Sequence, residues 1–480
     1  MILESMHYGN RHRTAWMLSL ATAIFVIAAT ALSWGKLAAF RYNAIDLAYY
    51  NQALWNTIHG RPFGLSIHPH LTLGDHFEPI LLLLAPLYAL APGPKILIAL
   101  QALALGGSAF LVFLLSKEIL KQSAARDRWA FGIAFAWLVN PFVWNIQLFE
   151  WHTLPFSIPP LLAAFLFFER RRLLPFLGTL ALALLVREDV ALIVAGFGLY
   201  ALIRRRPVLW IIPPFILGLG WFLLAQRAIA RFAIGGAYKF LVYYGWLGDS
   251  FGEIAVKIFQ KPLYVAAHLA TFANVEMIIG LLMPFLFIPI VAPQALLVAL
   301  PTLAQFLLGA PGGSSLIFET HYVSLFLPAL FTAFIFGVRA LPIIPRLGAI
   351  IKQHPALLPL LLASTTVYGA VMLGPIPGTM QSLRLSKNDP LVSEAQRMLN
   401  LIPADAGVAA SYAYLPQLSS RKNLASLHYV FLGLTQFGAA PYTLPQNIDY
   451  LLIDTQDFLI YGLQFPKTTW TREAYASGPA

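Results

Sequence analysis

The chain has 480 residues, of which 59% are hydrophobic and only 11% are charged, whereas a typical soluble domain is about a quarter charged. No water-soluble core absorbs that much apolar surface, so a soluble globular protein is excluded. The formal net charge is +11, but the basic residues cluster in short loops between apolar runs, where they report membrane orientation, so we expect no nucleic-acid partner. The absence of cysteine excludes disulfides and thiolate metal ligands.

Several apolar runs approach or exceed the roughly 20 residues that are needed to cross a bilayer. They include residues 15–34, 96–115, 129–148 and 323–338. Each is predicted to be a helix, because only helices and closed barrels satisfy their backbone groups in lipid. The first run is longer than a signal-peptide core and has no clear cleavage site, so we expect a retained anchor. The sequence predicts an all-α polytopic membrane protein with about 11 transmembrane helices.

Residues 35–78 are predicted to form the first external loop. The basic N-terminus stays in the cytoplasm by the positive-inside rule, so the first span ends outside. The loop is rich in polar and titratable groups, which are Asp46, Asn51, Gln52, Asn56, His59, His68, His70, Asp75, His76 and Glu78. An apolar stretch at 79–91 follows and is shorter than a span. The loop is therefore the first candidate for a functional site.

Some of these residues also have a structural interpretation. Asp46 opens an apolar-rich stretch at 47–55 and fits a helix N-cap, a role that is compatible with catalysis. His68 and His70 fit ordinary loop residues.

A metal site is a further alternative in the same loop. Asp75, His76 and Glu78 offer ligands for a divalent cation, and oxygen ligands alone suit Mg²⁺ or Mn²⁺. Their spacing matches no recurrent metal motif, so the metal stays unknown from the sequence.

The segment between two arginine clusters is the most informative in the chain. The clusters lie at 170–172 and 204–206, and residues 173–203 between them are apolar except for Arg187-Glu188-Asp189 at the centre. If both clusters are cytoplasmic, the chain turns back, and two short helices place the three charges at the outer tip of a hairpin. The alternative is one long tilted helix with a buried ion cluster. Charged residues at membrane depth cost about 2.5–3.5 kcal/mol each and usually mark a functional site.

Two short external turns flank other spans. The turn at 149–152 carries Glu150 and His152, which also fit interfacial residues beside a tryptophan anchor. A later external loop carries His321 and Tyr322, which also fit a helix-end pair. The chain exits again from Val208, and the spans predicted after it are 278–291, 295–308, 323–338 and 356–373.

Composition changes abruptly after residue 374, where charge returns. Residues 392–401 have helical periodicity, and 407–411 and 448–454 are predicted to be short strands. We therefore expect a polytopic transmembrane domain at 1–374 and a small extracytoplasmic α/β module at 375–480. No obvious element closes the module, so we expect it to be truncated.

The groups gathered outside by this topology suit glycosyl transfer from a lipid phosphate. In that reaction a carboxylate takes a proton from the acceptor, and cations or a metal stabilise the departing phosphate. The candidate catalytic residues are Asp46, as base, Asp75 and Glu188. The candidates for binding the donor phosphate are Arg187, as clamp, His76, His321 and Tyr322. Further candidate site residues are Gln52, Asn56, Glu78, His152 and Asp189.

Several motifs together resemble one family. They are Asp46-Leu47-x4-Gln52-Ala53-Leu54-Trp55-Asn56-Thr57-x-His59-Gly60, Gly74-Asp75-His76-Phe77-x-Pro79, Leu87-Tyr88, Arg187-Glu188-Asp189-Val190-Ala191-Leu192 and Thr320-His321-Tyr322. From about Arg41 to the C-terminal module, the chain looks like the predicted-membrane-protein family called domain of unknown function 2079. That family resembles the GT-C superfamily of polyprenyl-phosphate-sugar-dependent glycosyltransferases.

The resemblance implies a GT-C-like fold and an acid in the first external loop as the base, which maps to Asp46. Similar proteins often have a lysine before Glu-Asp, whereas this chain has Arg187, which keeps the charge but alters the geometry toward a phosphate. The first loop has no Asp-x-Asp, which leaves metal dependence open.

We therefore expect an enzyme, a membrane glycosyltransferase that moves a hexose or pentose from a polyprenyl-phosphate-linked sugar. The acceptor, a glycan, lipid or protein, is met on the outer face of the cytoplasmic membrane, with the N-terminus inside and the module outside. Membrane lipid is expected as a further partner. The sequence identifies no definite cofactor, and the candidate that the acidic groups suit is a divalent cation, Mg²⁺ or Mn²⁺. The alternatives are a transporter or lipid flippase with its polar site at the hairpin 173–203, and a non-catalytic scaffold whose external domain binds a partner.

Overall fold

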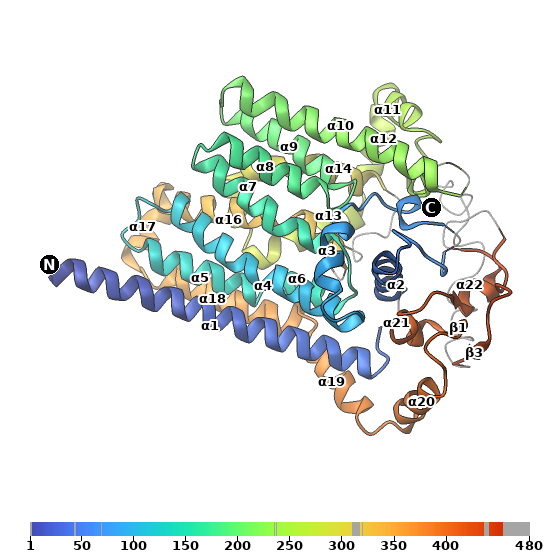
Figure 1. The fold of residues 1–480 in the computed structure, drawn as a ribbon. Helices are drawn as coiled ribbons and strands as arrows, with labels where there is room; N and C mark the ends of the chain where they lie inside the picture. The colour runs from blue at the N-terminus through green and yellow to red at the C-terminus, as the bar shows by residue number, and fades with distance from the viewer. Residues whose placement is uncertain are drawn as a thin grey trace.

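The computed structural model of the chain is a bundle of helices with a small sheet near one end (Figure 1). It describes residues 2–42, 45–68, 70–234, 236, 238–309, 317–318, 320–435 and 441–454, with side chains from residue 13 onward. Most of these residues are helical, and many of the helices are apolar. The predicted class of a mainly α-helical membrane protein is confirmed at this level.

The helices of the N-terminal half are α1 (Ile2–Ala38), α2 (Asp46–Ile58), α3 (Ile80–Tyr88), α4 (Pro94–Ile119), α5 (Arg126–Leu138), α6 (Pro141–Leu148), α7 (Ile158–Glu169), α8 (Leu173–Leu184), α9 (Val190–Ile203) and α10 (Val208–Phe232). Those that follow are α11 (Phe251–Gln260), α12 (Pro262–Leu269), α13 (Phe272–Leu282), α14 (Leu300–Leu308), α16 (Leu327–Ala340), α17 (Pro345–Gln353), α18 (Leu357–Tyr368), α19 (Ile376–Ser386), α20 (Pro390–Asn400), α21 (Leu415–Leu418) and α22 (Leu427–Leu432). Short 3₁₀ turns connect many of them.

Five helical segments in the described part of the chain are long and apolar enough to cross a membrane, and two bent helix pairs raise this to seven. The five are Arg13–Ala38, Pro94–Ile119, Arg126–Leu148, Val208–Phe232 and Leu357–Ser386. Three further apolar segments are shorter, namely Leu154–Glu169, Leu173–Leu184 and Val190–Ile203. The eleven spans expected from hydropathy included such short and broken segments, so that number stays a prediction.

Ion pairs show that the arginine clusters lie at one end of the bundle. Glu169, which ends α7, lies 3.1 Å from Arg204, directly after α9. Arg170 lies 3.5 Å from Glu118 near the end of α4. The chain therefore turns back between the clusters, and α8 and α9 form the predicted hairpin. The alternative of one long tilted helix is wrong.

The opposite end of the bundle collects the end of α1, the start of α4 and the end of α6. The Trp34 indole donates to the Lys95 carbonyl at 3.0 Å, and the Lys36 ammonium contacts the Leu148 carbonyl. The tip of the hairpin is tied to the same end, because the Ile80 amide donates to the Leu185 carbonyl at 2.7 Å. We call this the polar end of the bundle, since it holds the residues described below.

The predicted spans at 278–291 and 295–308 are wrong as continuous helices. Helix α13 stops at Leu282, and short 3₁₀ turns with left-handed Leu286 and Phe287 lead to α14. Four prolines between residues 284 and 301 explain the break, because each removes a backbone donor. Part of this irregular segment packs in the bundle, where Ala295 and Val298 contact α9, whereas Leu286, Phe287 and Ile290 are exposed.

A small parallel sheet lies near the C-terminus. Its strands are β1 (Val408–Ala410), β2 (Leu424–Ser426) and β3 (Tyr450–Leu452), in the order β2-β1-β3. Strands β1 and β3 fall in the two segments predicted as strands, and α20 matches the predicted helix. The apolar residues around the sheet share one core with Phe40, Ile45 and Ile67. The sheet region is therefore packed onto the segment 35–78.

Candidate functional site

The site is built from helix ends and from breaks between helices, all at the polar end of the bundle. The start of α2, the loop before α3, the turn between α6 and α7, the break between α8 and α9, and the turn before α16 converge there. Backbone groups at helix ends lack intrahelical partners, so side chains and loops gather at such places. This convergence joins residues that lie more than one hundred positions apart in the sequence.

Asp46 is the first residue of α2, and Ile45 before it is the N-cap residue, without a side-chain cap. The N-cap interpretation of Asp46 is therefore wrong. Its side chain is 34% exposed, and Oδ2 lies 3.4 Å from His152 Nε2. Burial acts to raise the pKa of the Asp46 carboxyl, but His152, His76 and His68 lower it on balance. Asp46 is thus an ionised and partly exposed carboxylate.

Two stacked imidazoles connect Asp46 to the hairpin tip. The rings of His152 and His321 lie 3.3 Å apart between centroids and are nearly parallel, with an interplanar angle of 19°. Burial lowers the pKa of both rings, and for His321 the neighbouring His152 and Arg187 lower it further. Both imidazoles are therefore neutral near pH 7. His321 Nε2 lies 3.4 Å from Arg187 Nη1, and it accepts this hydrogen bond because a guanidinium only donates.

Arg187 is buried and already has a carboxylate partner. Its Nε lies 3.0 Å from Asp189 Oδ1, and its Nη2 also contacts that carboxylate. The guanidinium faces the Tyr322 ring at 5.5 Å. Burial disfavours the Arg187 cation, but Asp189 and Glu188 raise its pKa well above the usual value. The structure thus brings Asp46, His152, His321, Tyr322, Arg187 and Asp189 together in one chain of contacts.

Glu188 makes a second ion pair beside the first. Its Oε1 lies 2.7 Å from His76 Nδ1, and its Oε2 accepts from the Phe77 amide at 3.0 Å. Burial raises the pKa of Glu188, but His76 and Arg187 lower it on balance, and Glu188 in turn raises the pKa of His76 against the effect of burial. The Tyr238 hydroxyl donates to Glu188 at 3.4 Å. The geometry therefore makes Glu188 the partner that fixes His76.

Glu78 is fully buried and accepts two hydrogen bonds on one oxygen. Tyr50 donates to Oε1 at 2.9 Å and Thr153 at 2.6 Å. Burial raises the pKa of Glu78 to about 7. Asp75, His76 and Glu78 thus contact three different partners, so the structure does not bring them together as the metal group that the sequence left as an alternative.

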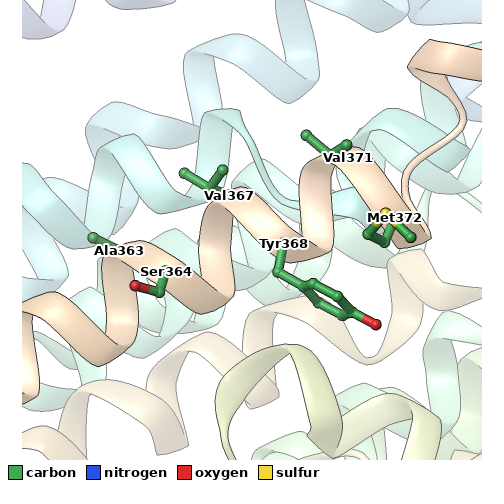
Figure 2. A pocket seen from close by; sticks show the side chains of 6 residues that line it. All are labelled: Ala363, Ser364, Val367, Tyr368, Val371 and Met372. Carbon is green, nitrogen blue, oxygen red and sulfur yellow. The ribbon is translucent and has the colours of Figure 1, made fainter.

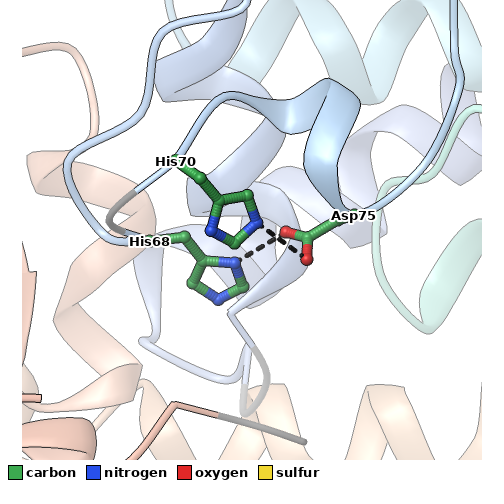
Figure 3. Close-up of side chains that lie close together, drawn as sticks. All are labelled: His68, His70 and Asp75. Atoms are coloured by element: carbon green, nitrogen blue, oxygen red, sulfur yellow. Dashed lines mark hydrogen bonds and ion pairs between the residues drawn. The ribbon is translucent and has the colours of Figure 1, made fainter. Parts of the chain in front are cut away.

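Asp75 instead joins two histidines that the sequence left as loop residues (Figure 3). Oδ2 lies 2.7 Å from His68 Nδ1 and accepts from the Tyr49 hydroxyl at 3.0 Å, and Oδ1 lies 3.0 Å from His70 Nε2. Lys239 also contacts this carboxylate. The interpretation of His68 and His70 as ordinary loop residues missed this cluster, and the short spacing of two histidines and an acid was the signal for it.

Gln52 and Asn56 lie on α2 but serve the loops next to it. The Gln52 amide donates to the Ser66 hydroxyl at 2.7 Å and to the Arg421 carbonyl at 3.1 Å. Asn56 donates to the Gly64 carbonyl at 2.9 Å. The structure does not bring either side chain to Asp46 or Arg187. Both instead stabilise the conformation of the segment 35–78 through these hydrogen bonds.

An apolar groove of ≈580 Å³ runs along α18 and the π-helical turn that follows it (Figure 2). It is lined by Ala363, Ser364, Val367, Tyr368, Val371 and Met372. The side chains of Val367 and Met372 are 63% and 64% exposed. The groove contains none of the predicted site residues, and its apolar wall suits contact with lipid chains.

These features define a polytopic membrane protein with a cluster of paired charges and imidazoles at one end of its helices. The chain belongs to the family described as predicted membrane protein (DUF2079), whose model matches residues 36–474. The expected family is therefore confirmed. No curated protein matches the chain.

Proposed function

We propose that the protein is a membrane glycosyltransferase that moves a sugar from a polyprenyl-phosphate donor to an acceptor at the polar end of the bundle. The observation that supports this most is the line of contacts from Asp46 through His152 and His321 to Arg187. It sets an ionised, partly exposed carboxylate and a cation on one side of the fold. Such a pair meets the two needs of the reaction, a base and a group that accepts the negative charge of the phosphate.

In this proposal Asp46 takes the proton of the attacking acceptor hydroxyl. The acceptor oxygen bonds to the anomeric carbon as the bond between that carbon and the phosphate oxygen breaks, and the electron pair leaves with the phosphate. The guanidinium of Arg187 commits Nε and Nη2 to Asp189 and directs Nη1 toward His321, so Nη1 is the group that would meet the phosphate. His152 and His321, neutral and stacked, position the two charged groups.

The polar end is the outer side of the cytoplasmic membrane in this proposal. The arginine clusters at 170–172 and 204–206 lie at the other end of the bundle, and clustered Lys and Arg favour the cytoplasmic side. The N-terminus would then be inside, and the C-terminal α/β module outside. The donor would reach the site from the surrounding lipid, and a glycan, lipid or protein acceptor from the aqueous side.

A transporter or flippase is the second candidate, and the broken backbone between α13 and α14 favours it, because transporter sites are often built on interrupted helices. The charged residues argue for the transferase instead. Arg187, Glu188 and Asp46 lie together at the polar end, rather than along the depth of the bundle. A substrate path would need polar groups at several depths.

The first test separates the base from the phosphate clamp. Asp46→Asn is expected to lower turnover by about 10²–10⁴-fold, the usual contribution of a general base, while the lipid donor still binds. Arg187→Gln is expected to weaken donor binding by about tenfold or more, because it removes the cation that meets the phosphate. Donor binding and turnover are both measured on the purified protein with a panel of polyprenyl-phosphate sugars.

Arg187→Gln is preferred to Arg187→Ala, because its amide can still donate a hydrogen bond to the buried Asp189 carboxylate. Arg187→Lys keeps the cation and should retain donor binding. Asp405→Asn, an exposed acid in the sheet region, is the matched control and should retain activity. Full turnover in Asp46→Asn would remove this residue from the mechanism, and unchanged donor binding in Arg187→Gln would remove the clamp.

A further inference from the structure

A group of potential metal ligands lies in the loop before α3, beside the proposed transfer site. One nitrogen of His68, one of His70 and a carboxylate oxygen of Asp75 all lie within 4.8 Å of one another. Figure 3 shows both rings turned toward the carboxylate. The proposed chemistry of Asp46 and Arg187 uses none of these three residues.

His70 is the member whose hydrogen-bonding capacity is unmet. Both of its ring nitrogens are buried, and within the described residues neither makes a hydrogen bond of good geometry, although Nε2 lies 3.0 Å from Asp75 Oδ1 as an ion-pair contact. A buried polar group without a partner destabilises the folded state. A metal ion bound between the rings and the carboxylate would supply that partner.

The other two members are held from behind. His68 Nε2 lies 3.2 Å from the Tyr429 hydroxyl on α22, which leaves Nδ1 directed at Asp75. The Tyr49 hydroxyl donates to Asp75 Oδ2 at 3.0 Å. Metal-binding imidazoles and carboxylates are characteristically oriented by such outer partners, which fix the ring and the free nitrogen.

We propose that His68, His70 and Asp75 bind one divalent transition-metal ion of the zinc type. Two imidazoles and one carboxylate suit Zn²⁺, whereas Mg²⁺ takes oxygen ligands. Ligand atoms about 2.0–2.1 Å from a tetrahedral zinc ion lie about 3.3 Å apart. The contacts of His68 and His70 to the two oxygens of Asp75, at 2.7 Å and 3.0 Å, need to open by a few tenths of an ångström, and the two imidazole nitrogens start within 4.8 Å of each other. The ion would hold the loop before α3 against α22 through Tyr429.

In the structure, the Lys239 ammonium is the cation that contacts Asp75, where the metal ion would bind. The ammonium contacts Oδ1, the oxygen that faces His70. A divalent ion and an ammonium cannot share that oxygen closely because like charges repel. Metal binding therefore requires Lys239 to move away, and the lysine competes with the ion.

The test measures metal binding by the full-length protein in detergent, purified with a tag that lacks histidine and stripped with a chelator. Zinc is titrated against a chromophoric chelator, and Co²⁺ serves as a spectroscopic probe. We expect one zinc ion per chain and visible Co²⁺ bands of a nitrogen and oxygen ligand set. His70→Ala should weaken zinc binding by about 100-fold or more, and His59→Ala, an exposed histidine of the same segment, should leave it unchanged.

Lys239→Met should tighten zinc binding by about tenfold, because the competing ammonium is gone. Failure of the wild-type protein to bind zinc, or Co²⁺ bands without nitrogen ligands, would overturn the site without any variant. Equal affinity in His70→Ala and the wild type would overturn it as well. None of these readouts depends on glycosyl transfer, so they remain decisive whatever the transferase assay shows.

Discussion

At the scale of single residues, the polar end is a set of charges that compensate one another. Arg187 is paired with Asp189, and Glu188 with His76. A buried charge is tolerated when it is paired, and removing one partner leaves the other uncompensated. Asp46 differs from these residues because its carboxylate is 34% exposed, which leaves it able to meet a substrate.

Glu78 gives the site a pH-dependent stability. Burial raises its pKa from 4.5 to about 7, with Glu188 acting in the same direction and His76, Arg187 and Thr153 against it. The folded state therefore holds the proton more tightly than the unfolded state. The free energy of unfolding should fall as the pH rises from about 4.5 to about 7, by about 3 kcal/mol for this group.

Glu78→Gln should remove most of this dependence and be more stable than the wild type at pH 8. The amide oxygen still accepts from Tyr50 and Thr153 but carries no charge. Thermal unfolding in detergent, followed between pH 5 and pH 8, measures the difference between variant and wild type. Glu394→Gln, at an exposed position of α20, is the control and should follow the wild type. If Glu78→Gln also follows the wild type at every pH, the assignment is contradicted.

At the scale of elements, the hairpin of α8 and α9 positions the charged tip. Helix α9 packs against the broken backbone before α14, and Gly196 permits the contact. A Cβ atom at this position would lie 2.1 Å from the Val298 carbonyl oxygen, which is backbone and does not move easily. The close approach of a helix to an irregular segment thus depends on one glycine.

Gly196→Ala should therefore destabilise the protein by about 1–3 kcal/mol, the usual cost of overpacking. Gly178→Ala is the matched control on α8, since a Cβ atom there meets nothing within 4 Å. It should be neutral or slightly stabilising, because alanine favours a helix over glycine. The midpoints of thermal unfolding in detergent check both, and equal midpoints for the two variants would refute the close contact.

At the scale of the whole molecule, the two ends of the bundle differ in chemistry. One end carries the arginine clusters, and the other carries Asp46, the hairpin tip and the sheet region (Figure 1). By the positive-inside rule, our proposal puts the first end in the cytoplasm and the second outside. This orientation can be tested directly, because the chain has no native cysteine.

Ser393→Cys, at an exposed position of α20, should react with a membrane-impermeant maleimide added to intact cells. Ser123→Cys, in the exposed turn between α4 and α5, should react only after the membrane is opened. The cysteine-free wild type measures background labelling. Labelling of both variants in intact cells, or of Ser123→Cys alone, would overturn the orientation.

The sequence by itself determined the class of protein, the hairpin and the end of the bundle at which candidate site residues gather. Hydropathy, helix length and basic clusters are properties of contiguous residues, so the turn between 170–172 and 204–206 followed from local chemistry. Asp46, Arg187 and His321 were expected on one side for the same reason. The prolines between residues 284 and 301 were also a local signal, because they indicate a break in the helix. The prediction of two regular spans there gave this signal too little weight.

Only the tertiary structure decided which side chains meet. Asp189 belongs to Arg187, and Glu188 belongs to His76, although both acids are neighbours in the sequence. Lys239 reaches Asp75 across 164 positions. Such pairings depend on how helices pack and where loops cross, and neither can be predicted from hydropathy. For the same reason the sequence grouped Gln52 with the site, whereas packing assigned it to the contact between α2 and the sheet region.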